Sequence, residues 1–298
     1  MIIDKKLRVL IIGGNRFFGL HLAKNFVAER HFVTLLNRGQ INDGLGDQVS
    51  RLKADRKSKS SLIDAVHGKT WDIIYDQVCY SAEEARVACE VFHGKTHRYI
   101  VTSSESVYDI GSSQSEHAFN PKSYSFTKEA LPHEDYQEAK RQVETVFANS
   151  DFKETVMVRP SLVVGEDDYT GRLKWHLDRI SNELPIYFPS INIQSDFIRS
   201  DQAGYALKKI GESNCVGPIN CTAPDSMSLE AILNICEEVV GKKAILASTE
   251  QEKNHSPYGG TETKTMNTKL LQSLGAKIEP SESWMKNLIG EVFASKTR

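Results

Sequence analysis

The sequence predicts an α/β protein with a doubly wound parallel sheet and a smaller C-terminal lobe. Three observations lead to this fold class. An apolar run over residues 7–12 ends in Gly13-Gly14, and apolar residues then recur at helical spacing over residues 20–27, as in a buried strand, a tight turn and a helix. Strand-like and helix-like patterns alternate as far as residue 160. With 298 residues, the chain is long enough to bury a large core.

Composition narrows the functional classes. The chain is 40% hydrophobic and 26% charged, as in ordinary globular proteins, and its net charge of −2 argues against a general nucleic-acid binder. The five cysteines show no C-x-x-C spacing and no histidine has a partner at metal-ligand spacing, so we expect reduced thiols and no metal site. No signal peptide and no apolar run of ~18 residues is visible, which predicts a cytoplasmic protein without a membrane span.

The turn after the first strand is the first candidate site. In a Rossmann-type unit, a strand, a glycine turn and a helix present free backbone N–H groups and a positive helix end to the pyrophosphate of a dinucleotide. A tight turn without a ligand is the alternative. We expect six residues of this turn to contact a nicotinamide cofactor: Gly13, Asn15, Arg16, Phe17, Phe18 and Gly19.

The end of the second strand, residues 32–36, bears on the form of the cofactor. An acidic residue at this place would bind a free ribose 2′-hydroxyl, whereas an arginine accommodates a 2′-phosphate. The chain has Asn37 and Arg38 there, with Arg16 expected close by, which favours NADP over NAD. The alternative for Arg38 is a solvated loop charge.

Residues 40–60 form a polar segment with five clustered cations, Arg51, Lys53, Arg56, Lys57 and Lys59. An RNA-binding patch is one interpretation. A solvated loop followed by a helix is favoured, because no aromatic residues interleave for base stacking.

Further along, strands are expected at 71–78, 97–102 and 155–160, with a helix at 82–92. Ligands of parallel sheets bind beyond the carboxyl ends of the strands, so we expect Gln77 and Val78 to line the cofactor crevice. Residues 112–135 are polar and predict a loop over the site.

The pattern Y-x-x-x-K at Tyr136 and Lys140 points to acid–base chemistry. Residues four apart share a helix face, so the ammonium lies near the phenol, favours the phenolate and lowers the tyrosine pKa. Lys140 is also expected to reach the nicotinamide ribose. A second copy occurs at Tyr124 and Lys128. We favour Tyr136 because a clean amphipathic helix follows it, with a surface tyrosine as the alternative.

The expected organisation is a Rossmann domain over 1–160 with a return segment at about 193–220, and a substrate lobe over 161–192 and 221–298. Arg172 and Trp175 at the start of the lobe could clamp a diphosphate and stack on a base, with surface packing as the alternative. Asp201 is expected to cap the helix of the return segment. Helices are also expected at 228–240, 267–274 and 281–294.

These motifs resemble the extended short-chain dehydrogenases/reductases, a family that includes nucleotide-sugar epimerases and dehydratases. Gly13 and Gly19 match the first and third glycines of the G-x-x-G-x-x-G fingerprint, whereas Arg16 replaces the second. The G-G-x-R-F-x-G turn is similar to a sub-branch that includes chloroplast stem-loop RNA-binding proteins. The resemblance also covers the S-S-x-x-V-Y segment at 103–108 and the R-P-x-x-x-x-G segment at 159–165.

The resemblance implies Ser104 as the catalytic hydroxyl that would hold the substrate oxygen, and Asp55 as a contact of the adenine amine. It implies an NAD(P)-dependent epimerase or reductase that acts on a nucleotide sugar or a similar hydroxyl or keto substrate; a homodimer is compatible with it. Dehydratase activity ranks lower, because Ser104-Glu105 lacks an aspartate in the acid pair. The rival is a non-catalytic NAD(P)-sensing or RNA-binding protein on the same fold.

Overall fold

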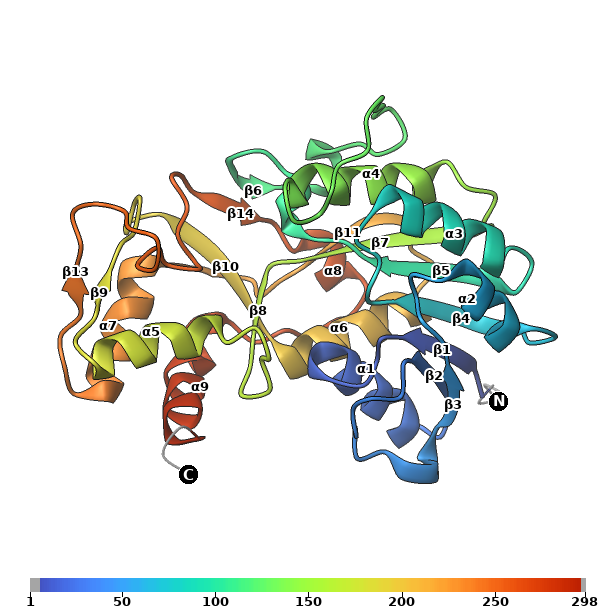
Figure 1. Ribbon diagram of the computed structural model, residues 1–298, viewed down its shortest axis with the longest axis horizontal. Helices are drawn as coiled ribbons and strands as arrows, with labels where there is room; N and C mark the ends of the chain where they lie inside the picture. Colours follow the sequence, from blue (N-terminus) through green and yellow to red (C-terminus); the bar gives the residue numbers. More distant parts are fainter. Residues whose placement is uncertain (1–5, 296–298) are drawn as a thin grey trace.

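A computed structural model describes residues 6–295. Its centre is a seven-stranded parallel sheet (Figure 1). The strand order is β11 (Gly217–Cys221), β7 (Glu154–Pro160), β5 (Thr96–Thr102), β4 (Trp71–Asp76), β1 (Arg8–Ile12), β2 (Phe32–Asn37) and β3 (Ser50–Lys53). The predicted α/β class with a doubly wound parallel sheet is therefore confirmed.

The order of the strands reverses between β1 and β4. From β1 the chain winds outward through β2 and β3, and from β4 it winds in the opposite direction through β5, β7 and β11. Ligands of such sheets bind at this reversal, beyond the carboxyl ends of the strands. The residues that follow β1 and β4 therefore occupy the expected place for a site.

Helices cover both faces of the sheet, which explains why β1 is apolar on both of its sides. One face carries α2 (Lys59–Val66), α3 (Ala82–Phe92) and α4 (Tyr136–Ala148), whose apolar residues form one core with Leu10 and Ile12. The other face carries α1 (Phe17–Ala28) and α6 (Ser200–Glu212), packed on Val9 and Ile11. The short helix α8 (Lys269–Ser273) adds Leu271 to this second core, so part of the segment expected in the lobe packs against the sheet.

The smaller lobe lies beside the carboxyl edge of the sheet (Figure 1). Its mixed sheet contains β12 (Ser226–Ser228), β10 (Gln194–Arg199), β14 (Lys264–Met266) and β6 (Gly111–Gln114), and β8 (Leu162–Val164) also pairs with β10. The strands β9 (Pro185–Ile186) and β13 (Ile245–Leu246) form a separate pair. Three helices supply most of the lobe's core, α5 (Arg172–Ser181), α7 (Leu229–Val240) and α9 (Ser281–Ser295).

Two expectations differ from the structure. The segment 112–135 is not all loop: β6 joins β14, and a short 3₁₀ turn follows at Glu116–Ala118. Further 3₁₀ turns lie at Gly46–Gln48 and Glu105–Val107. The prediction of Asp201 as a helix cap is wrong, because Arg199 holds the N-cap position of α6 and its guanidinium engages the Asp201 carboxylate at 2.6 Å.

The segment 105–119 is held in place by the fully buried Arg159. Its guanidinium binds both carboxylate oxygens of Glu144, the hydroxyl of Tyr108, and the backbone oxygens of Glu116 and Phe119, at 2.6–3.1 Å. The segment that follows the end of β5 is thus tied to β7 and α4. Among the helices of residues 6–295, none is long and apolar enough to cross a membrane.

Candidate active site

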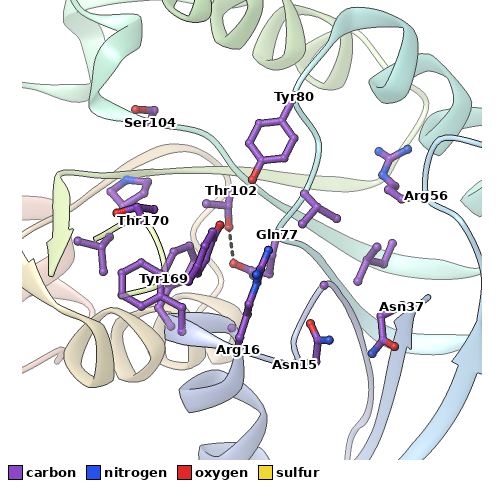
Figure 2. A pocket seen from close by; sticks show the side chains of 18 of the residues that line it. Asn15, Arg16, Asn37, Arg56, Gln77, Tyr80, Thr102, Ser104, Tyr169 and Thr170 are labelled. Carbon is purple, nitrogen blue, oxygen red and sulfur yellow. Dashed lines mark hydrogen bonds between the residues drawn. The ribbon is translucent and has the colours of Figure 1, made fainter. Parts of the chain in front are cut away.

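A cavity of about 790 Å³ lies at the reversal of strand order, between the carboxyl edge of the sheet and the lobe (Figure 2). This volume is within the usual range of cofactor and ligand sites. The lining is rich in cations, six against three carboxylates: Arg16, Arg38, Arg56, Lys57, Lys140 and Arg172 against Asp55, Glu84 and Glu105. A positive cavity of this kind favours a phosphate-bearing ligand.

The glycine turn forms the floor of the cavity. Gly13 has a φ of +89°, which favours glycine, and a Cβ there would lie 2.8 Å from a methyl group of Val78. A Cβ on Gly19 would lie 3.2 Å from the Cα of Gly14, so the helix packs closely on the turn. No side chain caps the N-terminus of α1, which leaves its first N–H groups available. All six turn residues expected at the site line the cavity: Gly13, Asn15, Arg16, Phe17, Phe18 and Gly19.

The exposed side chain of Arg16 reaches toward the lobe. Its guanidinium carbon lies 3.7 Å from the centre of the Tyr169 ring, and Figure 2 shows the two side chains together. Arg16 therefore stacks on an aromatic side chain of the segment before α5. This position gives no support to its expected place beside Arg38.

At the end of β2, Asn37 and Arg38 both line the cavity. The Asn37 side-chain oxygen accepts a hydrogen bond from the Gly39 N–H at 2.8 Å, which shapes the turn. Arg38 is exposed to solvent. Asp55 also lines the cavity, after β3, and its carboxylate accepts the Lys57 N–H at 3.0 Å.

At the end of β4, Gln77 and Val78 face the glycine turn. The Gln77 side-chain oxygen accepts a hydrogen bond from the Thr102 hydroxyl at 2.8 Å, the dashed line in Figure 2. The Gln77 side-chain nitrogen is buried and has no partner among the described residues. Both residues line the cavity, as expected from the strand-end rule.

Ser104, Tyr136 and Lys140 line the same cavity although they come from different elements. The Lys140 ammonium is 1% exposed and donates to the backbone oxygens of Cys79 and Thr102, at 2.8 and 3.0 Å. Two carbonyls leave one ammonium proton for another acceptor. The nitrogen lies 5.8 Å from the centre of the Tyr136 ring.

Ser104 and Tyr136 face the cavity differently. The Ser104 oxygen accepts the Ser106 N–H at 3.1 Å and keeps its own proton to donate. Tyr136 is the first residue of α4, and its side chain is 42% exposed. A ligand in the cavity could therefore contact both hydroxyls.

The second Y-x-x-x-K copy lies outside the cavity lining. The Tyr124 hydroxyl donates to a Glu138 carboxylate oxygen at 2.5 Å, and its ring packs edge-on against Phe119. These contacts give Tyr124 a structural role in the segment that covers α4.

Arg172 and Trp175 are separated by the structure. Arg172 begins α5 and lines the cavity, where its Nε donates to the Thr170 hydroxyl at 3.2 Å. Trp175 lies one turn later and is not part of the lining. Its ring meets His176 edge-on and lies 4.9 Å from the Arg179 guanidinium. The expectation that Trp175 stacks on a substrate base is therefore corrected, because the helix turns that side chain toward the core of the lobe.

Further residues line the cavity without a site role assigned from the sequence, among them Arg56, Tyr80, Glu105 and Tyr169. Arg56 is buried and donates to the Asp76 carboxylate at 2.7 Å. Glu105 follows Ser104 directly, and one of its carboxylate oxygens is buried without a partner among the described residues. Burial, and then the neighbouring Asp196, raise the pKa of Glu105 to about 8. In the sequence, the only signal for the place of Glu105 at the cavity is its position directly after Ser104.

One group in residues 6–295 has carboxylates and a histidine close enough for a metal: Glu29, His31 and Glu212. Its two carboxylates already bind the Lys208 ammonium at 2.6 and 2.8 Å. A lysine thus supplies the positive charge there, and we assign no metal site to this group.

Comparisons with known proteins show the family and the fold of the chain. The family model described as NAD dependent epimerase/dehydratase family matches residues 9–201. The chloroplast stem-loop binding protein of 41 kDa b from Arabidopsis thaliana is 30% identical over 203 residues, which are 63% of this chain. The match spans half of that relative's length.

Solved structures share the fold over nearly the whole chain. The UDP-glucose 4-epimerase of Thermus thermophilus, a complex with NAD, has a TM-score of 0.71 at 15% identity and covers 96% of this chain and 99% of its own. A putative epimerase from Burkholderia cenocepacia has a TM-score of 0.76 at 15% identity, with 96% and 98% covered. The dTDP-glucose 4,6-dehydratase of Bacillus anthracis, in complex with NAD, has a TM-score of 0.74 at 11% identity, with 98% of both chains covered.

Proposed function

This chain belongs to the NAD dependent epimerase/dehydratase family, and we propose that it is an NAD(P)-dependent epimerase or reductase that acts on a hydroxyl or keto carbon of a nucleotide sugar. The observation that carries the proposal is the meeting of three groups at one cavity: Ser104, Tyr136 and Lys140 line the same cavity as the glycine turn. No two of these residues are neighbours in the sequence, and one ligand could contact them all.

In the proposed reaction, a nicotinamide cofactor held at the glycine turn would supply the hydride acceptor and donor for the substrate carbon. The Tyr136 oxygen takes the proton of the substrate hydroxyl as the carbonyl forms, and gives it back in the reverse direction. The buried Lys140 ammonium lies 5.8 Å from the centre of the Tyr136 ring, on the same face of the helix. With its remaining proton, Lys140 would hold the ribose of the cofactor. The Ser104 hydroxyl donates to the substrate oxygen and holds it near Tyr136.

For the adenosine end of the cofactor, we propose a preference for the 2′-phosphorylated form. Arg38 lies in the cavity lining, and Asn37 stands where a carboxylate would repel the phosphate. NAD is the competing assignment, and it is the cofactor in the Thermus thermophilus and Bacillus anthracis complexes.

For the substrate, we propose a nucleotide sugar whose diphosphate lies near Arg172 at the lobe side of the cavity. A homodimer is part of the proposal, and light scattering would test it.

A direct test measures thermal stabilisation by NAD, NADP and a panel of UDP- and dTDP-sugars, followed by turnover of Tyr136→Phe. The variant keeps the ring and removes the acidic proton, so turnover should collapse while the cofactor still stabilises the fold. Tyr124→Phe is the matched control and should keep full turnover. If no nicotinamide cofactor stabilises the wild-type protein, the proposal fails.

The second candidate function is RNA binding, which the printed name of the Arabidopsis relative suggests. Three of the five clustered cations are engaged internally: Arg51 with Asp43, Arg56 with Asp76, and Lys59 with Glu90. Few are thus left for phosphate contacts. We expect any RNA affinity to be largely lost between ~50 and ~200 mM salt. Tight, sequence-selective binding at physiological salt would favour this second candidate instead.

A further inference from the structure

We propose that Arg16 and Tyr169 form a clamp that binds a diphosphate across the mouth of the cavity. The inference rests on the proposed function, since the diphosphate would belong to the dinucleotide or to the nucleotide sugar. It assigns a role to Tyr169, and it explains how an arginine can replace a glycine in the turn. The clamp would join the glycine turn to the segment that leads into the lobe.

The first argument is the geometry of the pair. The Arg16 guanidinium carbon lies 3.7 Å from the centre of the Tyr169 ring, a cation–π contact. Such a contact uses the flat face of the guanidinium and leaves the N–H groups around its edge free to bind a phosphate. Both side chains are exposed at the cavity lining, so a ligand can reach them (Figure 2).

The second argument is that the Arg16 donors are not used elsewhere. Among residues 6–295, no hydrogen bond or ion pair engages its guanidinium, whereas Arg51 and Arg56 are each held by a carboxylate. Arg16 is also the N-cap residue of α1, where the helix end favours an anion. A cation at a helix N-terminus, whose N–H groups have no hydrogen-bond acceptor among the described residues, therefore lines the cavity.

The third argument is that Tyr169 is held in place from two sides. Its ring meets the buried ring of Phe17 edge-on, with centroids 5.9 Å apart. The segment before it is anchored by Asp167, whose carboxylate binds the His21 ring at 3.0 Å and the Ser200 hydroxyl at 2.7 Å. The partner of the guanidinium is therefore positioned in advance of ligand binding.

The chemistry of the ligand is a diphosphate, from either of two sources. Arg16 belongs to the turn that would hold the cofactor, while Tyr169 lies three residues before Arg172 at the substrate side. ADP is the probe for the dinucleotide source, and UDP is the probe for the nucleotide-sugar source. Adenosine and uridine are the controls without phosphate.

The test measures the affinity of the full chain for these four probes by calorimetry. Arg16→Ala should weaken ADP or UDP by about ten- to hundredfold, the usual effect of hydrogen bonds to a charged group. Binding of the two nucleosides should change by less than about twofold, because they carry no phosphate. A loss for ADP assigns the clamp to the cofactor, and a loss for UDP assigns it to the substrate. Unchanged affinity for both diphosphates would overturn the proposal.

Matched variants separate the clamp from a general charge effect. Lys24→Ala removes an exposed cation of α1 outside the cavity lining and should leave ADP and UDP binding unchanged. Tyr169→Phe keeps the ring and should be silent, whereas Tyr169→Leu should cost about two- to fivefold. If the two residues act together, the double variant Arg16→Ala/Tyr169→Leu should lose no more affinity for the diphosphates than Arg16→Ala alone. Additive losses would overturn the pairing.

The clamp and the proposed function can fail separately. If neither NAD nor NADP binds the wild-type chain but Arg16→Ala still weakens ADP, the clamp stands and the redox function falls. Suppose instead that a nicotinamide cofactor, ADP and UDP each bind with the same affinity to the wild type, to Arg16→Ala and to Tyr169→Leu. The function then stands and the clamp falls.

Discussion

The buried polar groups beneath the segment 105–119 differ from those around the cavity in how completely they are hydrogen-bonded. Beneath the segment, all five N–H groups of Arg159 have acceptors, and both oxygens of Glu144 have donors. The Tyr108 hydroxyl accepts from Arg159 and donates to Asn220 at 2.7 Å. Nothing in this network is left for a ligand.

Around the cavity, the buried polar groups make only some of the hydrogen bonds that they could make. Arg56 makes one hydrogen bond, to Asp76, and its Nε and Nη1 groups have no partner among the described residues. The Gln77 amide nitrogen, the Ser103 hydroxyl and one Glu105 oxygen are likewise buried without partners there. Buried polar groups without partners are rare in folded proteins and call for water, a ligand or a functional reason.

The difference separates scaffold from site. A complete network in a buried place holds a segment in one position, so its loss should appear as lost stability. A group at the cavity with only some of its hydrogen bonds made contributes less to the stability of the fold. Its replacement should therefore change ligand binding or the pH dependence of stability instead. Five single variants test this distinction.

The largest expected effect belongs to Arg159→Met. It leaves the Glu144 carboxylate buried without its cation, which typically costs about 3–5 kcal/mol. Urea unfolding should show this loss as a lower midpoint. Replacing Glu144 by Leu in the same chain should recover much of it, since a buried pair exchanged for apolar residues is often neutral. A loss below about 1 kcal/mol for the single variant would contradict a scaffold role.

Arg56→Met also leaves a buried carboxylate, that of Asp76, without its cation, but it should cost less, at the lower end of this range of about 3–5 kcal/mol, because only one hydrogen bond is lost. The Asp76 carboxylate would keep the Tyr99 hydroxyl at 2.9 Å and the Val78 N–H at 3.2 Å as donors. The same urea experiment gives the comparison. If Arg56→Met and Arg159→Met lose the same free energy of unfolding, the number of hydrogen-bonded N–H groups on the arginine does not decide how much a buried arginine–carboxylate pair stabilises the fold.

The residues at the cavity could be predicted from the sequence better than the buried network of Arg159. Residues of the glycine turn and the ends of β2 and β4 line the cavity as expected, because strand ends of a parallel sheet meet at one edge. The cation–π contact of Arg16 with Tyr169 could not be predicted. The two lie 153 positions apart in the chain, and their contact depends on how the lobe segment docks.

The hydrogen bonds of Arg159 could not be predicted from the sequence either. Its position in an R-P-x-x-x-x-G run indicated where the chain leaves the sheet, but not that the guanidinium would reach Glu116 and Phe119. Trp175 shows the converse case. Its residue type allowed stacking on a base, with surface packing as the alternative, whereas the rotation of α5 decides which side chain faces the cavity, and it selects Arg172.

Glu105→Gln should change the pH dependence of stability. Because the folded-state pKa of about 8 lies above the value of about 4.5 for an unperturbed glutamate, the folded protein binds this proton more tightly. The stability from this group is therefore complete below about pH 4.5 and is lost as the pH rises toward 8. The variant should flatten the profile over this window, because a glutamine side chain binds no proton. Asp196, whose pKa is raised to about 7 mainly by burial, retains part of the slope. An unchanged profile would mean that Glu105 is solvated.

Ser103 and its neighbour Thr102 give the smallest and most discriminating contrast. Both side chains are buried at the cavity, but the Thr102 hydroxyl donates to Gln77 whereas the Ser103 hydroxyl has no partner among the described residues. Thr102→Val should therefore cost about 1–2 kcal/mol in the urea experiment, since it also leaves the Gln77 oxygen unpaired. Ser103→Ala removes only an unsatisfied group and should stay within about 0.5 kcal/mol of the wild type. If a ligand completes that hydroxyl, the same variant should weaken ligand binding by about fivefold, the value of one neutral hydrogen bond. A stability loss for Ser103→Ala as large as that for Thr102→Val would show that the Ser103 hydroxyl is already satisfied in the unliganded protein, by water, and that the cavity groups form a closed network as well.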